Sequence, residues 1–303
     1  MRYTASVSSL FHVVFCGTPL FAVPALKALT EDPAFIVDLV ITQPDRKQGR
    51  RHVITKPPVK IVAEKLGLRI WQPENINSHV SKLEARSSKL DFLIVVAYGQ
   101  ILSKEALNIP RIAPVNLHAS LLPRWRGASP IEHAILAGDQ ETGITIQRMV
   151  EELDAGPILA QERLPIGPEE TAEDLRKRLA ELGAELLVQT LKNPPHPIPQ
   201  PTTGITLCHK LTRTSGTMDP TTMRAESIHR AVRALTRWPG VRIPRTSDGE
   251  LMIIRSSLLP HPDAIPLSCA ANTLLYLREV QSPGKKAMTG TAWLRGQRSH
   301  GVY

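Results

Sequence analysis

Three short runs of apolar, β-rich residues most constrain the fold of this chain. They cover residues 11–15, 35–41 and 91–97. The third run is rich in β-branched residues and is followed by Gly99, which is typical of a strand buried on both faces. Apolar residues at helical spacing lie between the first two runs, in residues 20–29. The order strand, helix, strand predicts a parallel α/β sheet.

The first run leads into a tight turn, Cys16–Pro19. We expect Thr18 to cap the helix that follows and Pro19 to occupy its first position. The turn contains no G-x-G-x-x-G pattern, so a dinucleotide site is not indicated.

A stretch rich in proline divides the chain. Five of the nine residues 193–201 are proline, which predicts a stiff, extended linker. At 303 residues the chain can form two domains. We therefore expect a first domain over residues 1–192, a linker over 193–209 and a second domain over 210–303. Short strands among turns in the second domain suit a small β-barrel.

Composition narrows the class of protein. A hydrophobic content of 42% fits a soluble protein, and no apolar run is long enough to span a membrane. The cysteines Cys16, Cys208 and Cys269 lie far apart, without the spacing of a zinc site. This usage favours a reducing compartment and predicts no metal centre.

The positive charge is concentrated in the last third of the chain. Residues 193–303 hold 14 Lys and Arg against 6 Asp and Glu, whereas residues 1–192 hold 23 against 22. A basic region of this kind usually indicates a polyanion partner. The alternative is a basic surface that only keeps the protein soluble.

Two polar residues alternate with apolar ones in Val115–His118. Asn116 and His118 should point to one side of a short strand, where they offer an amide donor and a titratable imidazole. One interpretation is a strand end whose polar pair is satisfied by backbone groups. The other is a catalytic pair.

The wider sequence around this pair resembles the signature of the folate-dependent formyltransferases. Asn-x-His continues into Ser-Leu-Leu-Pro-Arg-Trp-Arg-Gly, and Leu-Asp-Ala-Gly-Pro-Ile-Leu follows, with Asp154 38 residues after Asn116. Further similarity covers nearly the whole chain. The resemblance implies a Rossmann-like formyltransferase domain with a parallel sheet, followed by a small OB-like β-barrel domain that holds tRNA.

A basic loop over residues 42–52 is similar to the loop that enters the acceptor arm in methionyl-tRNA formyltransferases. It contains Thr-Gln-Pro-Asp-Arg and Gly-Arg, but Arg51-His52-Val53-Ile54 replaces the usual lysine-rich continuation. The resemblance and the charge of the second domain together give candidate tRNA contacts at Arg46, Arg50, Arg51, Arg233 and Arg237. Arg233 lies on a helix over 225–235 and Arg237 directly follows it, and the stems of both could instead pack against the first domain.

The implied reaction transfers a formyl group from 10-formyltetrahydrofolate to the α-amine of methionine on initiator tRNA. Asn116 and protonated His118 would stabilise the tetrahedral oxyanion, and Asp154 would favour the imidazolium and assist proton removal through water. No metal is needed. The resemblance gives the following residues as the lining of the folate site: Ala97, Tyr98, Gly99, Ser120, Leu121, Leu122 and Pro123.

Two other functions remain open at this point. A formyltransferase for a small amine, such as a nucleotide sugar, would keep Asn116, His118 and Asp154 without needing the basic loop. A catalytically silent RNA-binding protein would keep the fold alone. We expect a cytoplasmic, bacterial monomer that does not bind membranes. Residues 1–10 read as a loose extension, with a weak organelle-targeting segment as the alternative.

Overall fold

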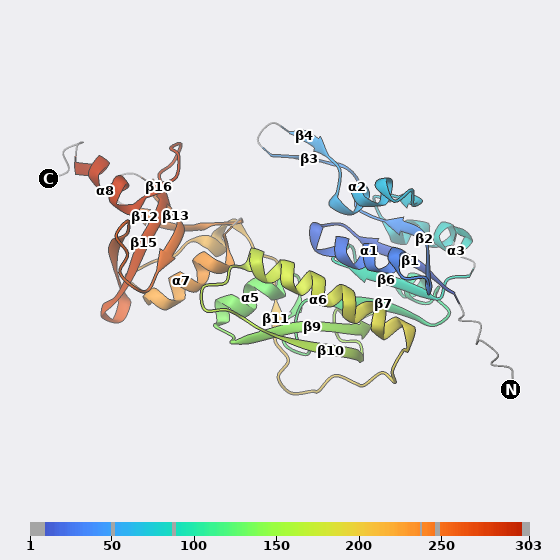
Figure 1. Cartoon of the computed structure of the whole chain (residues 1–303). Helices are drawn as coiled ribbons and strands as arrows, with labels where there is room; N and C mark the ends of the chain where they lie inside the picture. The colour runs from blue at the N-terminus through green and yellow to red at the C-terminus, as the bar shows by residue number, and fades with distance from the viewer. Residues whose placement is uncertain (1–9, 50–51, 87–88, 237, 246–248, 299–303) are drawn as a thin grey trace, which may run out of the picture. The chain divides into compact units, whose positions relative to one another are not determined.

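The computed structural model describes residues 10–49, 52–86, 89–236, 238–245 and 249–298 (Figure 1). The N-terminal extension over residues 1–9 lies outside them. The chain forms two compact units, of which the first comprises Met1–Gly127, Gly143–Leu164 and Arg176–Leu207. The second comprises Ala128–Thr142, Pro165–Leu175 and Cys208–Tyr303. No helix in the described part of the chain is long and apolar enough to cross a membrane.

A seven-stranded sheet forms the centre of the first unit (Figure 1). In spatial order its strands are β10 (Ile158–Pro165), β9 (Glu141–Arg148), β7 (Ala113–His118), β6 (Phe92–Val96), β1 (Phe11–Gly17), β2 (Phe35–Ile41) and β5 (Ile70–Trp71). The pairs from β7 to β5 are parallel, and β9 runs antiparallel to β7. The predicted parallel α/β sheet is therefore confirmed, with an antiparallel addition at one edge.

The three apolar runs form β1, β2 and β6, and their side chains build the core. All five residues of β6 are buried, as expected for a strand covered on both faces. On one face of the sheet, alternate residues of these strands form a continuous cluster with Ile76, Leu83 and Tyr98; the strand residues are Val14, Cys16, Leu39, Ile41, Leu93 and Val95. Burial of each aliphatic side chain contributes roughly 1.5–3 kcal/mol to folding.

Helices connect and cover these strands. They are α1 (Val23–Glu31), α2 (Pro58–Lys65), α3 (Val80–Arg86), α4 (Lys104–Leu107) and α6 (Ala172–Lys192), with 3-10 turns η1 (Leu20–Ala22) and η2 (Ile76–His79). Helix α6 approaches β7 closely at Gly183, where a Cβ atom would lie 2.9 Å from Cδ1 of Leu117. The Leu117 face of β7 is thus covered by α6. Asn116 and His118, which alternate with Leu117, point to the other face.

Two local expectations were wrong. Thr18 does not cap a helix, because its hydroxyl donates to the carbonyl oxygen of Tyr98 at 2.8 Å and so ties the β1 turn to the end of β6. The basic loop contains a hairpin of β3 (Arg46–Gln48) and β4 (Val53–Thr55), which pair antiparallel. Its β-branched Val53 and Ile54 favour a strand.

The proline-rich segment is extended, but it does not run free of the first unit. Ile198 forms an antiparallel bridge with Ile158 of β10, with reciprocal backbone hydrogen bonds of 2.7 and 2.8 Å. Farther along, β11 (Leu207–Cys208) pairs with β8 (Arg126–Gly127). β8 belongs to the loop after β7, residues 119–127, which we call the signature loop because it continues the Asn-x-His signature.

The second unit contains an antiparallel sheet, which agrees with the short strands predicted for the second domain. Its strands are β12 (Val241–Arg245), β13 (Gly249–Ser257), β15 (Thr273–Gln281) and β14 (Ile265–Cys269), and β16 (Met288–Thr289) pairs with β15. The helices are α5 (Pro130–Ala137), α7 (Ala225–Ala234) and α8 (Gly290–Arg298), with turns η3 (Arg213–Gly216) and η4 (Ala270–Asn272).

Helix α7 buries more of its surface than the sequence pattern indicated. Ile228 and Val232 are buried, and His229, although polar, is only 3% exposed. His229 is four residues after buried Ala225 and three before Val232, so it belongs to a wide apolar stripe. Its Nδ1 lies 3.0 Å from the hydroxyl of Ser256.

Candidate functional site

Strand β7 carries Asn116 and His118 to its carboxyl end, on the face away from α6. His118 is buried, whereas Asn116 is partly exposed. Ligands of open α/β sheets bind at the carboxyl ends of parallel strands, so the predicted pair occupies the expected edge.

Asp154 reaches this pair from the loop between β9 and β10. Its Oδ1 lies 3.3 Å from Nδ2 of Asn116 and 3.6 Å from Nδ1 of His118. Its Oδ2 accepts a hydrogen bond from the backbone N–H of Gly127 at 2.8 Å. The structure therefore brings the three predicted catalytic residues together, although 38 residues separate Asn116 from Asp154.

The orientation of the His118 ring follows from its two neighbours. Nε2 lies 2.9 Å from the carbonyl oxygen of Trp125, which can only accept a hydrogen bond, so Nε2 carries a hydrogen. Nδ1 is then directed at the carboxylate of Asp154. A protonated ring would carry a hydrogen on both nitrogens, and this is the form that can stabilise a developing negative charge.

Two residues of β9 support the site and were missed in the sequence. Gln147 lies opposite Asn116 and Thr145 lies opposite His118 in the β7–β9 register. Gln147 is 1% exposed, and its Nε2 donates to Oδ1 of Asp154 at 3.0 Å. The signal was available, because Thr145 and Gln147 alternate with the apolar residues Ile144 and Ile146, at the period of a strand.

Thr145 holds the start of the signature loop. Its hydroxyl donates to the carbonyl oxygen of Ser120 at 2.6 Å and accepts from the N–H of Leu122 at 3.1 Å. Gln161 of β10 donates both to this hydroxyl and to the carbonyl oxygen of Leu122. Ser120 in turn donates to the carbonyl oxygen of Arg124 at 2.6 Å, so these loop residues have a fixed backbone.

Backbone strain is concentrated around the same site. Ala97, Trp125 and Asp154 have φ angles of +47°, +61° and +51°, in the left-handed region that non-glycine residues rarely adopt. Such conformations persist where surrounding contacts determine them, and they gather at functional sites.

The turn Ala97–Gly99 presents its backbone to the site edge and its central side chain to the core. Tyr98 is 1% exposed and packs in the main cluster, and burial raises its pKa. Its carbonyl oxygen accepts from Thr18 and, at 3.4 Å, from Nε2 of Gln43. Any contribution of Tyr98 to a folate site would therefore come from its backbone.

The structure describes two of the five candidate tRNA contacts, Arg46 and Arg233. Arg50, Arg51 and Arg237 lie outside the described residues. Arg46 is exposed and pairs with Glu74 at 2.8 Å. Arg233 is half-buried, and its Nη1 donates to the carbonyl oxygen of Glu170 at 2.9 Å within the second unit. Burial lowers the pKa of Arg233.

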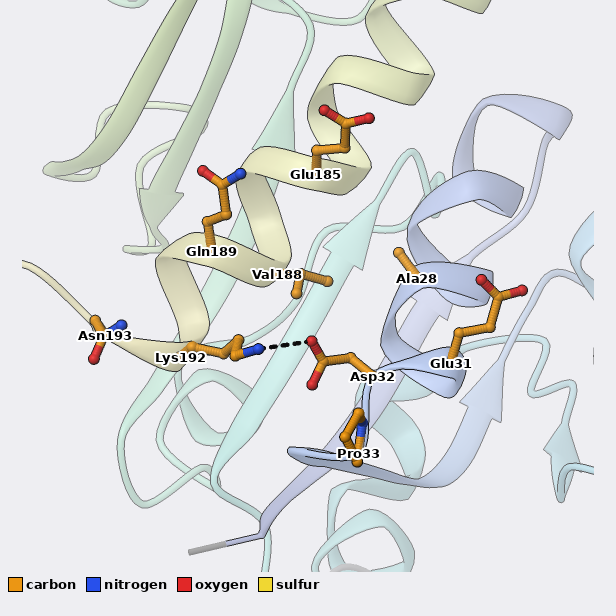
Figure 2. Close-up of a pocket in the computed structure, with 9 residues that line it drawn as sticks. All are labelled: Ala28, Glu31, Asp32, Pro33, Glu185, Val188, Gln189, Lys192 and Asn193. Atoms are coloured by element: carbon orange, nitrogen blue, oxygen red, sulfur yellow. Dashed lines mark hydrogen bonds and ion pairs between the residues drawn. The ribbon is translucent and has the colours of Figure 1, made fainter. Parts of the chain in front are cut away.

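A separate open depression of about 640 Å³ lies between α1 and α6 (Figure 2). Its residues are Ala28, Glu31, Asp32, Pro33, Glu185, Val188, Gln189, Lys192 and Asn193, none of which belongs to the predicted site. Figure 2 shows Lys192 directed at Asp32, with 2.9 Å between Nζ and Oδ2. This ion pair joins the ends of the two helices.

Comparison with known proteins decides the family. The formyl transferase profile matches residues 11–191, and the profile of the formyl transferase C-terminal domain matches residues 210–298. A methionyl-tRNA formyltransferase of Gluconobacter oxydans is 40% identical over 298 residues, covering 94% of this chain and 97% of the relative. The chain belongs to the methionyl-tRNA formyltransferase family.

Other relatives of this formyltransferase support the same family and fold. A methionyl-tRNA formyltransferase of Halorhodospira halophila is 49% identical over 236 residues, covering 77% of this chain and 75% of the relative. Among solved structures, an N-formyltransferase from Helicobacter canadensis, in complex with folinic acid and dTDP-3-aminofucose, aligns with a TM-score of 0.66. It is 16% identical and covers 88% of this chain and 99% of its own, so it supports the formyltransferase fold alone.

Proposed function

We propose that this protein transfers the formyl group of 10-formyltetrahydrofolate to the α-amino group of methionine on initiator tRNA, for translation initiation. The observation that carries the proposal is the convergence of Asn116, His118 and Asp154 within 3.6 Å in a chain of this family. We further infer that it acts as a monomer in the bacterial cytoplasm.

The site residues suit acyl transfer to an amine. The amine nitrogen attacks the formyl carbon, and the carbonyl oxygen becomes a tetrahedral oxyanion. Asn116 has a second amide hydrogen besides the one directed at Asp154, and it would donate this hydrogen to the oxyanion. The protonated ring of His118 would add a positive charge nearby.

Proton balance then completes the reaction. The attacking amine loses a proton, which Asp154 would accept through water. The bond between the formyl carbon and the folate nitrogen breaks, the carbonyl re-forms, and the released folate nitrogen takes up a proton. About half of the α-amino groups are neutral near pH 8, so the nucleophile needs little activation.

The two substrates would use different parts of the chain. We assign the folate to the backbone of Ala97–Gly99 and to the Ser120–Pro123 segment, and the acceptor arm to the hairpin that follows β2. The basic charge of residues 193–303 would attract the rest of the tRNA, because its phosphates are a dense array of negative charge.

One experiment separates this proposal from its alternatives. Purified protein would be incubated with 10-formyltetrahydrofolate and, in parallel, methionyl initiator tRNA, uncharged tRNA or a nucleotide-linked amino sugar. We expect formyl-methionine from the charged tRNA alone. Formylation of the sugar only would identify a small-amine formyltransferase, and tRNA binding without any transfer would identify a silent RNA-binding protein.

A further inference from the structure

The proline-rich segment after α6 contributes a side chain to the support of the site. Gln200 extends from this segment and is partly buried. Its Nε2 donates to the carbonyl oxygens of Asp154 and Gly156, at 2.8 and 2.7 Å. Its Oε1 accepts from Nε and Nη2 of Arg126, at 3.1 and 2.9 Å. A glutamine amide has two hydrogens and two lone pairs, so this side chain uses its whole hydrogen-bonding capacity here.

Through these bonds, Gln200 connects two loops of the site. Arg126 belongs to the signature loop, and the next residue, Gly127, donates its N–H to the carboxylate of Asp154. Asp154 and Gly156 belong to the loop between β9 and β10. Gln200 therefore holds the backbone of the loop whose carboxylate faces His118.

The Asp154 loop needs such support because of its own conformation. Asp154 has a φ of +51°, and a Cβ atom at Gly156 would lie 1.8 Å from the carbonyl oxygen of Arg148. The turn is thus both strained and tightly packed, and a backbone of this kind is retained only where neighbouring groups fix it.

A second residue of the same segment fixes the other partner of His118. The hydroxyl of Thr206 accepts from the N–H of Trp125 at 2.8 Å, and the carbonyl oxygen of Thr206 accepts from the N–H of Arg126 at 2.9 Å. The Trp125 carbonyl oxygen is the acceptor at Nε2 of His118. One extended segment therefore sets the groups on both sides of the imidazole.

We propose that Gln200 is a positioning residue for formyl transfer, acting through the backbone of the Asp154 loop. Gln200 and Thr206 then support the loops of the site, so the segment that holds them is not only a spacer between domains. This inference rests on the proposed catalytic roles of Asp154 and His118. Misplacement of a catalytic group by about 1 Å costs on the order of a hundredfold in rate, so the effect should be measurable.

The test uses the full-length protein with Gln200→Ala and Gln200→Glu. The glutamate keeps the acceptors for Arg126 but replaces the donor to Asp154 and Gly156 with a carboxylate. We expect both variants to lower kcat about tenfold to a hundredfold, with the KM for the formyl donor changed by less than about twofold. Thr203→Ala, an exposed change in the same segment, should leave kcat unchanged.

Two readouts distinguish positioning from a general loss of structure. In an Asp154→Asn background, Gln200→Ala should cost less than about threefold, because the group it positions is already impaired. Hydrogen exchange at residues 124–128 and 152–157 should become faster in both Gln200 variants but not in Thr203→Ala. A kcat within twofold of wild type in a folded variant, or an equal loss in the Asp154→Asn background, would overturn the proposal.

Hydrogen exchange also separates this inference from the proposed function. If wild-type protein formylates none of the acceptors offered, the proposed function fails while the exchange experiment still decides whether Gln200 holds the two loops. If transfer occurs and exchange in those loops is unchanged, the positioning role fails alone.

Discussion

Nδ1 of His118 lies 3.6 Å from Oδ1 of Asp154, and Nε2 of the same ring lies 2.9 Å from the carbonyl oxygen of Trp125. Both nitrogens thus face oxygen atoms that accept hydrogen bonds. Only the contact at Nε2 is within hydrogen-bond distance. The buried ring is thus held at one nitrogen by the loop after β7 and faces the carboxylate of Asp154 with the other.

Replacement of any one of the three central residues should impair transfer without unfolding the protein. We expect Asn116→Ala, His118→Ala and Asp154→Ala each to lower kcat by at least about a hundredfold, the range for lost oxyanion donors and acid–base groups. Steady-state formylation with circular dichroism checks this. Glu151→Ala is the matched control, since Glu151 is an exposed acid just before Asp154. A folded single variant with nearly normal kcat would remove that residue from the mechanism.

Gln147 should matter for both activity and stability. Gln147→Leu keeps the approximate volume but removes the buried donor to Asp154, so we expect kcat to fall about tenfold. The free energy of unfolding should fall by about 1–3 kcal/mol because the side chain lies in a satisfied polar network. Denaturant unfolding and kcat would be measured together. Wild-type kcat in the leucine variant would contradict a supporting role for Gln147.

The basic residues of the last third of the chain should show their role in the salt dependence of tRNA binding. Lys285 and Lys286 are exposed, so Lys285→Glu with Lys286→Glu should weaken binding and flatten the slope of log K against log salt. Lys65→Glu, an exposed charge reversal on α2, is the control. By contrast, Arg233→Ala should mainly lower the melting temperature, because its guanidinium donates to the backbone carbonyl of Glu170. An unchanged slope in the double lysine variant would place the tRNA contacts elsewhere.

The buried His229 should make the second unit sensitive to acid. Burial lowers its pKa and Arg233 and Arg230 lower it further, whereas nearby Glu169 raises it, with a net decrease. The unfolded chain therefore binds the proton more readily, so the stabilisation is complete above about pH 6.5 and is lost as the pH falls below it. His229→Gln should flatten unfolding free energies measured between about pH 7.5 and 5.5. If the variant loses as much unfolding free energy as the wild type when the pH falls, other groups cause the effect.

The sheet could be predicted from the sequence because its signals are local. The β-branched run before Tyr98 and the alternation of Asn116 and His118 each reflect burial on defined faces of a strand. The catalytic set was reachable only through the family signature, since no local pattern says that Asp154 returns to β7.

The support of the site could not be read in the same way. Gln200 follows a run of prolines, and such a run describes stiffness but not the surface along which the segment lies. The burial of His229 is equally hidden, because a polar ring counts against burial in a sequence pattern and the sequence does not show that Ser256 supplies its partner. Thr18 likewise carried the mark of a helix cap, yet it bonds to Tyr98, which is 80 residues away in the chain.

The contacts of Gln200 and Thr206 bear on how the two halves of such proteins can be exchanged. A chimera joined just after Lys192 would replace residues 193–207 and leave Arg126 and the Asp154 loop without Gln200 and Thr206. A junction after Leu207, where the first compact unit ends, keeps these residues together with the loops that they hold. A new RNA-recognition module should therefore be joined after Leu207, fifteen residues beyond the end of helix α6 at Lys192.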